Sequence, residues 1–101
     1  LVMQEIVAYL GYSESGEELT YWHTYDNIEV DAVIGNARVA IEIKSTDNVQ
    51  PSHKKGLTEF AKEHPHVKQI LVSRDRISRR IGDVDLYYVT DFFKALWNGE
   101  I

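Results

Sequence analysis

Two short runs of alternating apolar and charged residues, joined by a glycine and an asparagine, constrain the fold of this chain more than any other feature. The runs cover residues 29–34 and 38–45, and Gly35 and Asn36 lie between them. Alternation with a period of two is typical of β-strands, and a Gly-Asn pair permits the positive φ angles of a tight turn. We therefore predict a β-hairpin over residues 29–45.

The predicted hairpin has one apolar face and one charged face. Strict alternation places these residues on the apolar face: Ile28, Val30, Ala32 and Ile34, with Val39, Ile41 and Ile43. A two-residue turn sets Glu29 opposite Glu42, whereas a four-residue turn sets Asp31 opposite Glu42 and Glu29 opposite Lys44. Both registers bring three carboxylates and Lys44 together. An odd-length turn would separate the two apolar faces, which the hydrophobic pattern opposes.

Facing carboxylates repel one another unless positive charge lies between them. Oxygen ligands suit Mg²⁺ or Mn²⁺, and such metals activate water for phosphodiester hydrolysis. We expect Asp31 and Glu42 to hold the metal, and Lys44 to orient a water or to stabilise charge that develops on phosphorus. The alternative is a charged face that is simply solvated, with Glu29 and Lys44 as a cross-strand ion pair.

The rest of the chain predicts helices around a mixed sheet. The expected elements are a helix with Met3, Ile6, Val7 and Leu10 on one side that ends at Gly11, strands over 19–24, 69–73 and 86–89, a helix over 54–63, and a last helix capped by Thr90 and closed by Asn98 and Gly99. The strand, helix, strand order implies a parallel crossover. The predicted class is α/β (α+β), with a mixed β-sheet, an antiparallel hairpin, one parallel crossover and flanking helices.

Length and composition indicate a single domain over residues 1–101. No apolar run approaches eighteen residues, so we expect no membrane partner. The chain has no cysteine, which excludes thiolate metal sites and fits a cytoplasmic protein. It opens at Leu1 without an initiator methionine, already inside a helical pattern, so we expect a fragment of a longer protein.

The charge is distributed unevenly along the chain. The net charge is −5, yet no lysine or arginine precedes Ala32 and all eleven follow it. The residues that we expect to contact phosphate are Lys54, Lys55, Arg74, Arg76, Arg79 and Arg80. The alternative is a solvated loop whose arginines are balanced by Asp75, Asp83 and Asp85.

Two sets of residues carry a resemblance to known families. Glu29-Val30-Asp31 followed by Ile41-Glu42-Ile43-Lys44 resembles the Asp…Glu-X-Lys signature of the PD-(D/E)XK restriction-endonuclease-like superfamily. Nearly the whole chain is similar to the C-terminal domain of unknown function 4143. The residues of this wider likeness are Tyr21-Trp22, Glu29-Val30-Asp31, the run from Ala40 to Ser45, Lys55-Gly56-Leu57 and the run from Ile70 to Ser73.

The resemblance implies a restriction-endonuclease-like fold with Asp31, Glu42 and Lys44 as catalytic residues. It implies metal-dependent cleavage of DNA by a nuclease-like domain that follows an AAA+ type, ATP-binding ATPase domain in a prokaryotic protein. The alternative is a catalytically inactive module of the same fold that binds nucleic acid or a protein partner. The superfamily usually adds an acidic residue from its first helix, and Glu5 is the available stand-in, with Glu29 as a supporting carboxylate.

Overall fold

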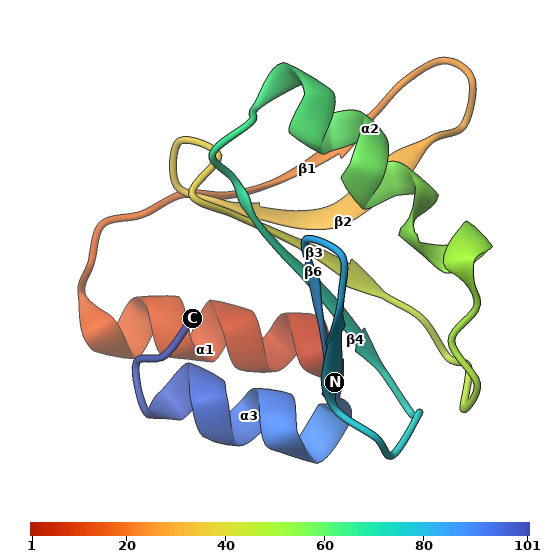
Figure 1. Ribbon diagram of the computed structural model, residues 1–101. Coiled ribbons are helices and arrows are strands. Elements are labelled where there is room, and N and C mark those ends of the chain that lie inside the picture. Colours follow the sequence, from red (N-terminus) through yellow and green to blue (C-terminus); the bar gives the residue numbers. More distant parts are fainter.

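A single six-stranded sheet runs through the molecule, with helices on both faces (Figure 1). The computed structural model describes all residues, 1–101. The helices are α1 (Val2–Ser13), the 3-10 helix η1 (Pro51–Lys54), α2 (Lys55–Glu63) and α3 (Val89–Trp97). The strands are β1 (Leu19–His23), β2 (Glu29–Ile34), β3 (Val39–Ile43), β4 (Lys68–Ser73), β5 (Arg79–Ile81) and β6 (Val84–Tyr88). The predicted α+β class with a mixed sheet is therefore confirmed.

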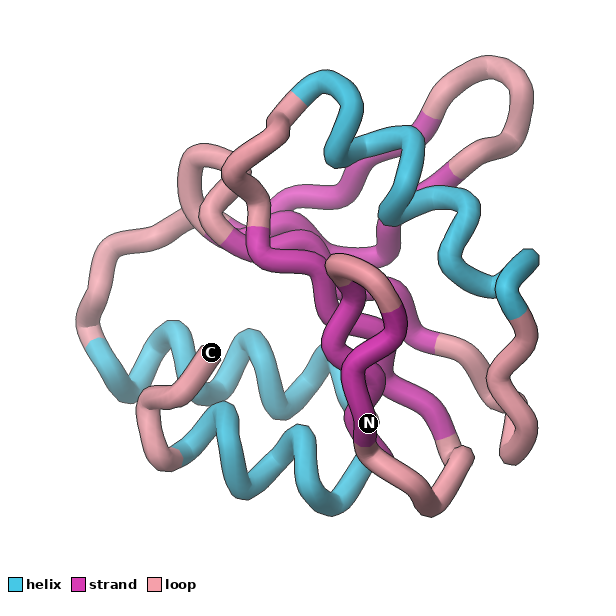
Figure 2. The backbone as a smooth tube through the Cα atoms, viewed as in Figure 1, coloured by secondary structure: helices cyan, strands magenta, loops and turns pink.

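The strand order in the sheet is β1-β2-β3-β4-β6-β5. Strands β1, β2 and β3 pair antiparallel, β4 pairs parallel with both β3 and β6, and β5 pairs antiparallel with β6. The predicted hairpin is present in the four-residue register, because Ile34 pairs with Val39 and Ala32 with Ile41. The predicted parallel crossover runs from β3 through α2 to β4, as the tube in Figure 2 shows.

Each face of the sheet carries its own hydrophobic cluster. Helices α1 and α3 cover one face, where Ile6 and Phe92 pack on Ile41 and Ile70. Helix α2 covers the other face. That second cluster comprises Val30, Val33, Ala40, Val49, Leu57, Phe60, Val67, Leu71, Val84 and Leu86. Because Val33 of β2 and Ala40 of β3 lie in this second cluster and Glu42 is buried, the alternative of a hairpin whose charged face is simply solvated is wrong.

A β-bulge in β2 breaks the strict alternation that the sequence suggested. Thr20 pairs with Val33 while Trp22 pairs with Val30, so Asp31 and Ala32 lie together opposite Tyr21. One extra residue on a strand turns the preceding side chain to the other face. Val30 therefore packs on the α2 side, and its predicted place beside Ala32 was wrong.

One end of each of two helices differs from the prediction, and one strand was not predicted. Helix α1 continues past Gly11 to Ser13 and ends at Glu14, whose φ of 53° is left-handed. Helix α3 begins at Val89 directly after Tyr88, without a side-chain cap, so Thr90 is not the capping residue. Strand β5 was missed, because its three residues carry two arginines and no apolar alternation. None of the helices is both long and apolar enough to span a bilayer.

Candidate functional site

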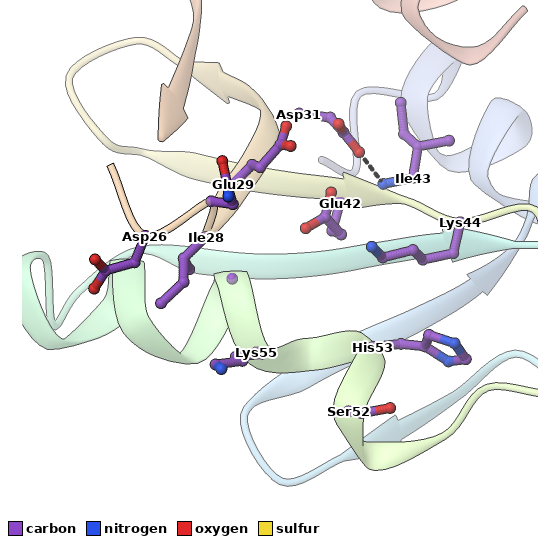
Figure 3. A pocket seen from close by; sticks show the side chains of 12 residues that line it. Asp26, Ile28, Glu29, Asp31, Glu42, Ile43, Lys44, Ser52, His53 and Lys55 are labelled. Atoms are coloured by element: carbon purple, nitrogen blue, oxygen red, sulfur yellow. Dashed lines mark hydrogen bonds between the residues drawn. The ribbon is translucent and has the colours of Figure 1, made fainter. Parts of the chain in front are cut away.

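The candidate site is a cavity of about 350 Å³ beside the ends of β2 and β3, where α2 begins. Side chains of opposite character line its two sides (Figure 3). The residues of the carboxylate side are Asp26, Glu29, Asp31 and Glu42, and those of the donor side are Lys44, Ser52, His53 and Lys55. The four predicted residues Glu29, Asp31, Glu42 and Lys44 thus line one pocket.

Asp31 sits in the bulge of β2, and its carboxylate takes the place of a backbone carbonyl as the acceptor for an amide of β3. Asp31 Oδ2 accepts a hydrogen bond of 2.8 Å from the Ile43 amide, drawn as a dashed line in Figure 3. Backbone pairing between β2 and β3 extends from Ile34 only as far as Ala32. The two strands consequently part at Asp31, and the pocket opens where they part.

Glu42 is the buried carboxyl of the site, with 4% of its surface exposed. Its pKa is raised from 4.5 to about 8, first because burial disfavours the charged form. Asp31 raises it further, because the Asp31 carboxylate accepts a hydrogen bond from the protonated Glu42 and repels its charged form. Lys44 and the Ile43 amide act in the opposite direction. At neutral pH Glu42 therefore retains its proton.

Lys44 begins the donor side of the pocket. Its backbone N–H donates to Val72 O at 2.9 Å, which fixes the residue one step beyond β3. Figure 3 shows its side chain reaching back along the strand toward Glu42. Lys44 forms no ion pair with Glu29, so the cross-strand pair considered as an alternative is absent.

The glycine of α2 lets that helix approach the carboxylates closely. A Cβ at Gly56 would collide with Glu29 O and would lie 3.0 Å from Glu42 Oε2. The residue is buried and α2 packs on β2 and β3 at this end. A glycine in a helix costs stability unless close approach requires it, so Gly56 within the predicted helix over 54–63 is a signal in the sequence that the helix packs closely.

The remaining predicted acidic residue lies elsewhere. Glu5 Oε2 accepts a hydrogen bond of 2.9 Å from Trp97 Nε1, between α1 and α3, and does not line the pocket. No three carboxylate or imidazole side chains lie close enough to hold a metal ion together. Two carboxylates fit Mg²⁺ or Mn²⁺, because such ions commonly keep several waters and take one or two carboxylates together with substrate phosphate.

The structure does not gather the predicted phosphate-binding residues at one place. Lys55 lines the pocket, but Lys54 and the four arginines do not. Arg79 pairs with Asp75 at 3.2 Å, Arg80 pairs with Asp85 at 3.0 Å, and the Arg76 guanidinium lies over the Tyr88 ring. Arg74 lines a neighbouring cavity that also contacts Lys44. Arg79 and Arg80 belong to β5, so the loop considered as an alternative does not contain all four arginines.

Asp75 joins the segment after β3 to the segment after β4. Its Oδ2 accepts from the Val49 amide and from Arg79, both at 3.2 Å, and its Oδ1 accepts from the Ile77 amide. The Arg79 guanidinium and these amides lower its pKa from 3.8 to about 2. Asp75 therefore anchors the chain between Lys44 and His53, a role that sequence reasoning missed.

We predict that Asp75→Asn lowers the thermal stability of the domain and makes that stability less sensitive to acidic pH. A carboxyl with a lowered pKa stabilises the fold above pH 3.8, and this contribution is lost as the pH falls through about 2. Thermal melts followed by circular dichroism across this range will measure the effect. Asp85→Asn is the matched control, because its partner Arg80 is exposed. Identical acid profiles for Asp75→Asn and the unaltered protein would contradict the prediction.

Comparison with known proteins identifies the family. The family model described as domain of unknown function (DUF4143) matches residues 1–92. The chain belongs to this family. The chain matches no curated protein and no solved structure. The match extends from α1 to the first turn of α3, so it includes every residue that lines the pocket.

Sequence reasoning missed further residues of the DUF4143 pocket, among them Asp26 and His53. Asp26 comes from the turn between β1 and β2, and His53 comes from η1. Neither position follows an alternating or helical pattern, so periodicity gave no signal for them. Pro51 at the start of η1 marked the polar break that positions His53.

Proposed function

We propose that this DUF4143 domain is a PD-(D/E)XK nuclease-like module with a restriction-endonuclease-like fold, and that it cleaves DNA phosphodiester bonds with Mg²⁺ or Mn²⁺. The observation that supports the proposal is the buried Glu42 beside Asp31 in an open pocket. A proton now compensates this carboxyl pair, and a divalent cation would do so better. We further propose that the domain follows an AAA+ type ATPase domain of a prokaryotic cytoplasmic protein and acts on DNA that the ATPase delivers.

Each residue of the site has a defined role in this proposal. Asp31 and Glu42 would hold the metal, which when bound would act as a Lewis acid and activate water. Lys44 would donate a hydrogen bond to a phosphate oxygen and stabilise charge that develops on phosphorus. Helix α2 would exclude bulk water from Glu42, because Gly56 lies against that carboxyl. Glu29 would add charge at the rim without contacting the metal.

We predict that the domain binds Mn²⁺ and that the double variant Asp31→Asn/Glu42→Gln weakens binding at least tenfold. The variant removes both anionic ligands but keeps an oxygen that can accept from Ile43. Isothermal titration calorimetry above pH 8, where Glu42 is ionised, will measure the affinity. Glu5→Gln is the matched control, since Glu5 lies outside the pocket.

Cleavage is then tested on linear, nicked and branched DNA. The unaltered domain should cleave in Mn²⁺, and Lys44→Met should bind the metal normally but lose cleavage. Equal Mn²⁺ affinity for the unaltered domain and the double variant would refute a metal site at Asp31 and Glu42.

An inactive module of the same fold is the second candidate function. The observation that favours it is the engagement of Glu5 by Trp97, which leaves the pocket without a carboxylate from the first helix. In this case the domain binds nucleic acid or a protein partner without cleaving it. Binding of DNA without cleavage in Mn²⁺ would select this candidate.

A further inference from the structure

We infer that His53 is a substrate-contact residue whose Nε2–H binds a phosphate oxygen of the substrate. The inference rests on the proposed function and adds a residue to it. His53 lies in η1, directly before α2, and lines the pocket from the donor side. Figure 3 shows its ring below Lys44, across the pocket from Asp31.

Two hydrogen bonds fix the position of this ring. The Gln50 amide donates to His53 Nδ1 at 2.8 Å, and the His53 amide donates back to Gln50 O at 3.0 Å. A ring nitrogen that accepts a hydrogen bond carries no proton, so the proton of the neutral imidazole is on Nε2. The hydrogen-bond network thus assigns the tautomer and makes Nε2 a donor.

No hydrogen bond within the chain uses this donor. Nδ1 is the only ring atom of His53 with a hydrogen-bond partner. The other basic or hydroxyl-bearing residues that line the pocket are Lys44, Ser52 and Lys55, which are cations or hydroxyl donors. A group that binds here must therefore be an acceptor, and an anionic one suits the two lysines best.

The opposite side of the pocket explains why the acceptor is a phosphate. The carboxylates there repel an anion unless a cation lies between, and a phosphate ester can contact a metal with one oxygen and donor groups with another. Contacts of this kind position a nucleic acid backbone without selecting its sequence. We therefore expect His53 to bind a backbone phosphate and to transfer no proton.

Variant His53→Asn separates this contact from the structural role of the residue. Asparagine offers an oxygen close to the Nδ1 position, so it can keep the bond from Gln50, but it has no donor at the Nε2 position. His53→Gln has the opposite character, because its amide nitrogen lies close to the Nε2 position. The exposed His66, which lies outside the pocket, gives the matched control His66→Asn.

The experiment uses the background Asp31→Asn/Glu42→Gln, in which no metal is needed to offset the two carboxylates. The probe is thymidine 3′,5′-bisphosphate in EDTA. Calorimetry should show that His53→Asn weakens binding about three- to tenfold, the usual effect of one lost hydrogen bond. His53→Gln should recover part of the loss, and His66→Asn should bind as the background does. In ¹⁵N-labelled protein the His53 Nε2 signal should shift when the bisphosphate is added.

Three outcomes would overturn the inference: no binding of the bisphosphate, equal affinity for His53→Asn and the background, or an Nε2 signal that does not move. Failure of the proposed nuclease function is a separate result. It shows as a lack of Mn²⁺ binding or of cleavage by the unaltered domain, whereas the bisphosphate experiment uses neither metal nor cleavage.

Discussion

Replacing Gly56 by alanine is expected to destabilise the domain by about 3 kcal/mol, at the upper end of the usual cost of overpacking. The added methyl group would collide with Glu29 O and touch Glu42 Oε2. A backbone carbonyl in a sheet cannot move aside as the end of a side chain can, so α2 as a whole must shift. The same shift would expose Glu42 to water. Urea unfolding followed by tryptophan fluorescence will measure the loss.

Gly11→Ala is the control for this substitution. Gly11 also lies within a helix, but a Cβ there has no atom within 4 Å. Alanine at such a position should stabilise the domain by about 0.5 to 1 kcal/mol, because it is the better helix former. Equal effects at Gly11 and Gly56 would mean that α2 does not need its close approach to β2.

Replacing Glu42 by glutamine is expected to stabilise the metal-free domain above pH 8 and to flatten its pH dependence. The pKa of Glu42 is 4.5 in its ordinary state and about 8 in the fold. Between pH 4.5 and about 8, Glu42 keeps its proton in the folded state but has lost it in the unfolded state. The free energy of unfolding therefore falls as the pH rises through this range, and it stays low above pH 8. We expect a loss on the order of 2 kcal/mol over this range, after allowing for screening by water in the open pocket.

Urea unfolding at several pH values between 4.5 and just above 8 will measure this slope. Glutamine has no proton to lose, so the stability of the Glu42→Gln variant should depend on pH much less than that of the unaltered protein. Glu63→Gln, at an exposed position at the end of α2, should keep it. If Glu42→Gln retains the full slope, then burial beside Asp31 does not control the titration of this carboxyl.

The central part of the fold could be predicted from the sequence because its apolar pattern has a clear period. Alternation across Gly35 fixed the hairpin, and its even turn length brought Asp31, Glu42 and Lys44 to one pocket. The apolar run Ile70 to Val72 indicated a strand covered on both faces, as β4 is. These features depend on the spacing of apolar residues along the chain, which can be read directly from the sequence.

The parts that could not be predicted depend on contacts between distant segments. At the bulge the register between β1 and β2 shifts near Asp31, and no local pattern in the sequence marks this shift. Strand β5 is a short edge strand whose arginines pair with aspartates, so it lacks an apolar period. The place of Asp75 depends on loops that meet only in the folded chain. His53 is held by Gln50 within a short 3-10 helix, which has no apolar period to reveal it.

The hydrogen bond from the Ile43 amide to Asp31 gives the site a built-in spectroscopic sensor. In most of the sheet an amide bonds to a carbonyl, whose charge does not change. Here the acceptor is a carboxylate that lines the pocket. The NMR frequency and exchange rate of this single backbone proton should therefore change when a group binds to Asp31, so that binding can be followed without an assay of turnover.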